Sequence, residues 1–308
     1  MTRARRLLRP LAERLAAGPL GRAVERLSSG PAGLAVLAYH RVVPERGEDP
    51  FSLAVSASRF EEQVRFLVSR YPVLPLDRAI EDLEAGRLPA RRAVAITFDD
   101  GYRDVKTRAA PILERLRAPA TLFLSTASAS SGAPYWWDLL PPLPSGAPGS
   151  LHRRAKAMAP DERDRLVASF GGPPPRDPDA QPMRFAEVRG LPGSIRIGGH
   201  GDRHLSLGLA PADSSRRDVA SCAAALRREL PGHIRLFAYP FGAPEDVSEH
   251  AARAVREAGF AAAFTTEEGI VRRGMDRYRL PRVRAREEGA GALALRLLRA
   301  FAGRRGGL

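Results

Sequence analysis

The sequence predicts a parallel α/β fold whose sheet of about seven strands closes into an irregular (β/α)7-type barrel. Short β-branched or apolar runs alternate with segments of helical periodicity along the 308 residues, and this alternation is typical of βαβ units. Hydrophobic residues make up 44% of the chain, which is enough for a substantial core. No internal repeat is present.

Seven segments have the composition expected of buried strands. In chain order they are 34–40, 93–98, 120–125, 194–198, 234–239, 261–266 and 278–283.

Six segments have apolar residues at helical spacing, and they are 57–70, 76–86, 104–117, 211–230, 246–258 and 290–303. In the first of them, Phe60, Val64 and Leu67 recur on one face. Ser58 is expected to cap the start of that helix, and Asp104 the start of the third.

Residues 141–182 interrupt the alternation. Two Pro/Gly-rich stretches flank a charged helical piece at 151–170, so we interpret 141–182 as an insertion on the barrel surface. The expected organisation is a basic amphipathic segment at 1–30, a barrel domain at 31–286 that contains the insertion, and a basic C-terminal helix and tail at 287–308.

The formal net charge of +14 is concentrated at the two ends of the chain. Residues 1–30 carry a net charge of +5 and residues 271–308 carry +8, so the other 240 residues carry only +1. The barrel is therefore nearly neutral, and only 6% of residues are aromatic. Both facts argue against a nucleic-acid partner.

The N-terminal segment has leucines at roughly helical spacing among arginines. They predict either a peripheral contact with an anionic membrane surface or packing against the domain. Glu13 and Glu25 interrupt the apolar stretch that a secretory signal needs, and no segment approaches a membrane span. The simplest expectation is a cytoplasmic protein, with a peripheral position at the inner membrane as the further option. The sequence leaves the oligomeric state open.

Polar residues follow several predicted strands where each strand ends. Asp99 and Asp100 follow the second strand, and His200 and His204 follow the fourth. Two imidazoles and one carboxylate suit zinc or another divalent ion that keeps open positions. Taken singly, an Asp-Asp-Gly is a common turn, an H-x3-H pair arises by chance, and His40 reads as a structural histidine. The combination favours a metal site held by Asp100, His200 and His204.

Here the chain resembles a known family, the polysaccharide deacetylases with the NodB homology domain (carbohydrate esterase family 4). "TFDDGYRD" is similar to the first family motif, "HGDRH" to the metal motif and "FAYPFG" to the groove motif. "YHRV", "YWWD" and "RLPRV" look like the subgroup that serves exopolysaccharide and surface-glycan pathways, in which a catalytic histidine lies near the N-terminus. The resemblance covers roughly residues 33–285.

The resemblance implies a NodB-like fold and a metal-dependent hydrolase of C–N bonds that removes N-acetyl groups from a glycan. Asp100, His200 and His204 would hold the metal, which is expected to be zinc. Asp99 would be the general base, the Tyr102 backbone N–H would stabilise the oxyanion, and His40 would protonate the departing amine.

The sequence departs from the family pattern in three places. Ala238 stands where many members have an arginine that orients the base, and Arg282 is the candidate replacement. No histidine follows His250, so the usual C-terminal histidine motif is missing. Gly201 replaces a hydroxyl residue of the metal motif.

Five residues are candidates for substrate contact. The resemblance places Tyr239, Pro240 and Phe241 in the substrate groove. Trp136 and Trp137 would either stack on a sugar or form a hydrophobic lid on the barrel end.

Two alternatives to N-deacetylation stay open at this point. The same site could hydrolyse another amide or an ester. The chain could also be a non-catalytic carbohydrate-binding or scaffold protein on a decayed enzyme fold.

Overall fold

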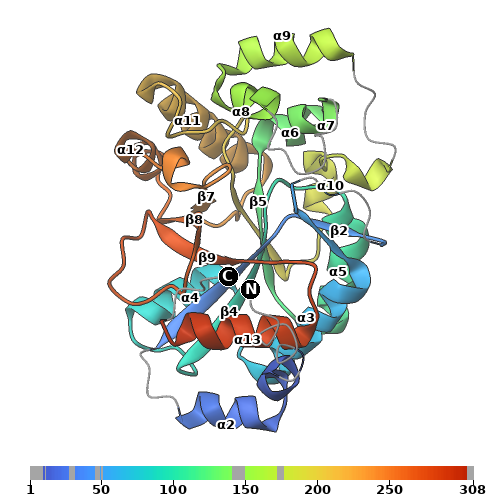
Figure 1. Ribbon diagram of the computed structural model, residues 1–308. Coiled ribbons are helices and arrows are strands. Elements are labelled where there is room, and N and C mark those ends of the chain that lie inside the picture. The colour runs from blue at the N-terminus through green and yellow to red at the C-terminus, as the bar shows by residue number, and fades with distance from the viewer. Residues whose placement is uncertain are drawn as a thin grey trace.

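The barrel expected from the sequence is present in the computed structural model, which describes residues 10, 12–27, 32–45, 49, 51–140, 150–171 and 177–303. Within these residues seven parallel strands close in the order β1-β4-β5-β6-β7-β8-β9, and Figure 1 shows helices surrounding them. Pairing of β9 with β1 closes the barrel. The strands are β1 (Gly33–Tyr39), β4 (Arg92–Phe98), β5 (Ala120–Leu124), β6 (Ile195–Gly199), β7 (Leu236–Ala238), β8 (Ala262–Glu268) and β9 (Leu280–Arg284).

Each predicted strand overlaps one strand of the barrel. Sequence analysis missed β2 (Arg41–Val43) and β3 (Ala54–Ser56), which pair in parallel beside the barrel. Three residues are too few for strand periodicity to show in a sequence. The β2 strand begins directly after His40, so this small sheet helps to fix where that residue lies.

The helices expected from the sequence are present, together with shorter ones that were not expected. The labelled α-helices are α2 (Pro19–Leu27), α3 (Ala57–Arg70), α4 (Leu76–Glu84), α5 (Ala110–Arg115), α6 (Thr126–Ser131), α7 (Trp136–Leu139), α8 (Ser150–Ala157), α9 (Pro160–Phe170), α10 (Phe185–Arg189), α11 (Ala212–Glu229), α12 (Glu249–Glu257) and α13 (Ala290–Phe301).

Both predicted helix caps were wrong. The residue that caps α3 is Ser56, whose hydroxyl accepts a hydrogen bond from the Arg59 N–H, because the helix starts two residues earlier than Ser58 would require. Asp104 stands at the N-cap position before Val105, but its side chain makes no capping hydrogen bond. Its carboxylate accepts hydrogen bonds from Arg41 Nε at 2.9 Å and from the Val42 N–H at 3.2 Å, and so ties β2 to the barrel.

The helix predicted at 104–117 is not a continuous α-helix. Val105–Ala109 forms a π-helical turn before α5 begins at Ala110. Pro111 has no N–H to donate, and its ring crowds the carbonyl one turn earlier, which gives the wider turn a physical cause.

The charged piece at 151–170 is two helices, α8 and α9, where one was expected. Pro160 opens α9 at a position where its missing N–H costs nothing. Figure 1 shows both helices near α7, beyond one end of the barrel. The parts of the predicted insertion at 141–149 and 172–176 lie outside the described residues.

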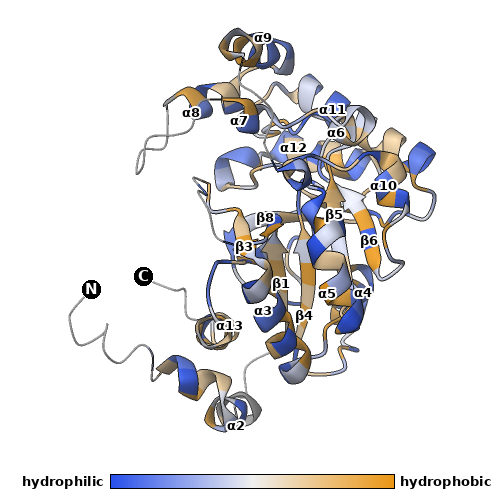
Figure 2. Cartoon of the chain, turned by 90° about the vertical axis from the view of Figure 1, so that its right-hand side faces the viewer, coloured by the Kyte–Doolittle hydropathy of each residue, from blue (hydrophilic) through white to orange (hydrophobic). Residues whose placement is uncertain are grey.

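The alternation of strand residues divides the core into two clusters. In β1, Leu34 and Val36 belong to a cluster that includes α4. Ala35 and Leu37 face the other way and pack in a larger cluster with residues of α3 and α13. Figure 2 shows the barrel strands as largely hydrophobic.

The N-terminal segment only partly packs on the domain. Ala16 is 5% exposed and belongs to the core, whereas Leu15 and Leu20 are 44% and 55% exposed. The Arg70 side chain donates a hydrogen bond to the Ala16 carbonyl. In the described part of the chain, no helix is both long and apolar enough to cross a membrane.

Candidate active site

The predicted site residues come from the carboxyl ends of different strands. His40 follows β1, Asp99 and Asp100 follow β4, and His200 and His204 follow β6. Parallel strands of a barrel end at the same rim, so the topology brings these distant segments together.

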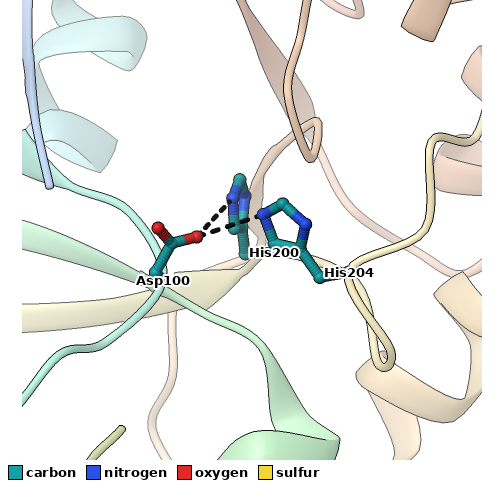
Figure 3. Close-up of side chains that lie close together, drawn as sticks. All are labelled: Asp100, His200 and His204. Carbon is teal, nitrogen blue, oxygen red and sulfur yellow. Dashed lines mark ion pairs between the residues drawn. The ribbon is translucent and has the colours of Figure 1, made fainter. Parts of the chain in front are cut away.

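Asp100, His200 and His204 form one buried cluster (Figure 3). Oδ1 of Asp100 lies 3.3 Å from Nε2 of His200 and 3.1 Å from Nε2 of His204. The three residues are 2%, 1% and 5% exposed. Two imidazoles and a carboxylate oxygen therefore converge where little water reaches them.

The cluster passes a direct test of fit for a divalent cation. Asp100 Oδ1 is buried and has no hydrogen-bond partner within the described residues, although two ring nitrogens lie close to it. Metal–nitrogen bonds of about 2.05 Å in a tetrahedral site would separate neighbouring ligand atoms by roughly 3.3 Å. The two separations from Asp100 Oδ1 are close to this value, and all three donor atoms lie within 4.8 Å of one another.

The two histidines differ in how readily they become the neutral imidazole that binds a metal. His200 Nδ1 lies 2.8 Å from the Ala238 carbonyl; that contact places the ring proton on Nδ1 and leaves Nε2 free to bind. Burial lowers the pKa of His204 to about 4. The pKa of His200 is raised, because Asp99 and Asp100 outweigh its burial, so a cation would compete with a proton there.

Backbone conformation aims two of these ligands. Asp100 and His204 have φ values of +71° and +50°, in the left-handed region that side chains other than glycine rarely adopt. Gly101 follows with φ +95°, and a Cβ there would overlap Leu124 Cδ1. Only glycine fits this turn, which lets Asp99 and Asp100 face the same site.

Asp99 pairs with Arg282, the residue that sequence analysis named as the candidate orienting charge. The guanidinium donates to both carboxylate oxygens, at 2.8 and 2.7 Å, and Arg282 is fully buried. Burial alone would raise the pKa of Asp99, but Arg282 and then His200 outweigh it and the pKa is lowered. Asp99 is therefore held as a carboxylate with a fixed orientation.

His40 also lies near the Asp99 carboxylate. Its Nε2 is 3.8 Å from Asp99 Oδ2, and its side chain is 17% exposed against 2% for Asp99. Burial lowers the pKa of His40, while the charges of Asp99 and Asp100 act to raise it. His40 thus reaches the site and is more open to solvent than Asp99.

The "YWWD" segment supports the residues around the acidic pair. The Tyr135 hydroxyl donates to the Asp100 carbonyl at 2.6 Å. The Tyr102 hydroxyl accepts from Trp137 Nε1 at 2.8 Å and donates to Asp138 at 3.0 Å. Within the described residues, the backbone N–H of Tyr102 donates to no acceptor. Sequence analysis gave Tyr135 and Asp138 no role, since their contacts run to a main-chain carbonyl and a hydroxyl.

The two tryptophans pack inside the protein. Trp136 and Trp137 are each 8% exposed and belong to an apolar cluster with residues of α8 and α9. The Trp137 ring stacks on Tyr135 at 4.4 Å and lies 4.5 Å from the His204 ring. These rings therefore form a wall beside the His204 ligand.

The groove-motif residues differ in their surroundings. Tyr239 is fully buried and its hydroxyl donates to the Tyr278 carbonyl, so its side chain is engaged within the fold. Pro240 lies against Gly201 in the metal loop. Phe241 is partly exposed and its ring centroid is 4.6 Å from that of His204.

The chain is similar to known polysaccharide deacetylases. A family model described as polysaccharide deacetylase matches residues 87–170. The chain is 25% identical over 253 residues to YxkH of Bacillus subtilis (strain 168), a candidate polysaccharide deacetylase, and the match covers 82% of this chain and 71% of YxkH.

Solved structures share the fold. IcaB from Ammonifex degensii has a TM-score of 0.59 at 23% identity and covers 86% of this chain and 97% of its own. The Streptococcus pyogenes deacetylase PplD, solved with acetate, has a TM-score of 0.59 at 19% identity, with coverages of 88% and 99%. At these identities the likeness concerns the architecture.

Replacing His204 tests the cluster directly. We expect His204→Ala to lose most of the metal that the wild-type chain retains after dialysis against Zn²⁺, because one of three protein ligands is gone. Metal content per chain measures this. His233→Ala is the control, because the ring nitrogen of His233 contacts the nearby Leu230 carbonyl and lies outside the cluster. Equal metal content in the His204 variant and the wild type would contradict the role.

Proposed function

We propose that the chain is a polysaccharide deacetylase with the NodB-like barrel fold, and that it removes N-acetyl groups from a glycan with the help of a bound divalent metal ion. Such enzymes are hydrolases that act on C–N bonds. One observation carries the proposal. Two adjacent carboxylates have separate partners, since Asp99 pairs with Arg282 and Asp100 faces two imidazoles.

Asp100, His200 and His204 would hold the ion, and zinc is our assignment from the nitrogen and oxygen donors. When bound there, such an ion lowers the pKa of a water molecule and polarises the acetyl carbonyl. The substrate follows from the chemistry of the family, an N-acetylated polysaccharide or glycan precursor.

Asp99 would act as the general base. It is ionised and oriented by Arg282, and one carboxylate oxygen also lies near His40. Arg282 would keep the Asp99 carboxylate fixed while this carboxylate takes a proton from the attacking water. It would stabilise the negative charge of Asp99 again once the proton has left.

Two further groups would complete the reaction. The Tyr102 backbone N–H has no partner in the described residues and would donate to the oxyanion. His40 would give a proton to the leaving amine, which departs poorly without one. Burial lowers the pKa of His40, and the neighbouring negative charge of Asp99 offsets this only in part. Arg282 supplies the charge that the family's arginine would provide at position 238. Its pairing with Asp99 argues against a decayed enzyme.

For the basic N-terminal segment we propose a peripheral contact with an anionic lipid surface. The proposal is supported by the exposure of Leu15 and Leu20, which lie within residues 1–30, a segment of net charge +5. Sedimentation with vesicles that contain phosphatidylglycerol should show binding at low salt that fades as salt is added. Equal behaviour with neutral phosphatidylcholine vesicles would contradict this contact.

Replacing the base separates turnover from metal binding. Asp99→Asn should lower kcat by about 100- to 10,000-fold while the metal content stays at the wild-type level. Because the change leaves Arg282 buried without its charge partner, it should also lower the melting temperature. The double variant Asp99→Asn/Arg282→Met should recover stability without recovering activity. Loss of metal in Asp99→Asn would contradict the division of roles between the two acids.

Replacing the acid should matter most for poor leaving groups. We expect His40→Ala to lower kcat about 100-fold on an N-acetylated oligosaccharide. On an acetyl ester of 4-nitrophenol the loss should be less than about tenfold, since that leaving group needs no proton. A comparison of the two substrates with wild type and variant measures the difference. The same loss on both substrates would show that His40 is not the acid.

A further inference from the structure

The two ligands with left-handed backbones need support from outside their own loops. A residue other than glycine is strained in such a conformation, and it persists there only where the surroundings enforce it. For Asp100 the support is visible, since the Tyr135 hydroxyl donates to its carbonyl at 2.6 Å. For His204 the corresponding support comes from helix α9, which belongs to the predicted insertion.

Arg163 of α9 reaches the main chain at His204. Its Nη2 donates to the Arg203 carbonyl at 2.9 Å, and its Nη1 donates to the His204 carbonyl in a longer contact of 3.5 Å. The side chain is buried, with Arg163 3% exposed, and the guanidinium lies 5.4 Å from the centre of the Trp136 ring. The Arg163 guanidinium, which belongs to the insertion, therefore donates to two successive main-chain carbonyls at a proposed metal ligand.

The contact is reciprocal. The Arg203 side chain donates to Asp161 and Asp164 of α9, at 2.5 Å in each case. We call this exchange between Arg163, Arg203, Asp161 and Asp164 the arginine clasp. On its other side, the loop is held by Asp218 of α11, whose carboxylate accepts the N–H groups of residues 202 and 203 at 2.9 Å.

Burying Arg163 is costly for folding alone. Its nearest carboxylate partner, Asp164, is 3.9 Å away and half-exposed, and Arg163 Nε is buried without a hydrogen-bond partner among the described residues. A buried charge with incomplete pairing is often replaced by an apolar side chain without loss of stability. The residue is better explained by what its two donors hold in place.

We propose that Arg163 is a positioning residue that holds the left-handed turn at His204, so that Nε2 of this histidine faces Asp100 and helix α9 sets the metal affinity of the site. The inference rests on the proposed function, since it requires the three ligands to bind an ion. It makes the insertion part of the active-site support, in addition to covering the barrel end.

The test compares Arg163→Met with Arg165→Met, an exposed arginine two positions further along the same helix. Zn²⁺ affinity is measured by competition with a chelator, and melting temperature with and without Zn²⁺. We expect Arg163→Met to bind Zn²⁺ about 10- to 100-fold more weakly, the range for groups that orient metal ligands, and to gain less thermal stability from the ion. Arg165→Met should match the wild type in both measurements.

A second variant covers the case in which Arg163→Met does not fold. Asp161→Asn/Asp164→Asn changes two exposed side chains. It breaks the Arg203 half of the clasp and the long contact between Arg163 and Asp164, but leaves the Arg163 hydrogen bonds to the two carbonyls. It should weaken Zn²⁺ binding in the same direction by a smaller factor. Wild-type affinity in both the Arg163 and the double variant would overturn the clasp alone. A wild-type chain that binds no Zn²⁺ would overturn the proposed function, and the clasp with it.

Discussion

The site depends on keeping two neighbouring carboxylates ionised at the end of a buried strand. Asp99 and Asp100 are 1% and 2% exposed, so water stabilises neither charge and each needs its own partner. Arg282 from β9 neutralises Asp99, while two imidazoles face Asp100. This separation suits the proposed division of roles, in which Asp99 is the base and Asp100 a metal ligand.

The barrel supplies the partners, and the added segments supply the rigidity. Strand ends deliver the acids, the histidines and Arg282 to one rim, but the turns at Asp100 and His204 are strained. Tyr135 and Arg163, both outside the barrel strands, bond the carbonyls of these turns. In the proposed account, segments added to a common fold thus position the side chains that would bind the metal.

The strands and the cluster of Asp100, His200 and His204 could be predicted from the sequence because both leave a local pattern. Apolar runs mark the strands, and acids or histidines follow them directly. Arg282 could be named because Ala238 left a charge to be supplied from elsewhere. The helix start at Ser56, the packing of Trp137 and the engaged hydroxyl of Tyr239 depend on tertiary neighbours. Arg163 bonds main-chain carbonyls, which any sequence possesses, so no spacing could have revealed its contact.

The central claim is that Asp100, His200 and His204 surround one metal ion, and X-ray absorption at the zinc edge of the loaded protein tests it most directly. The account predicts a first coordination shell of nitrogen and oxygen at about 2.0–2.1 Å, with the outer-shell scattering of two imidazoles. A shell without imidazole scattering, or a protein that takes up no zinc, would contradict it.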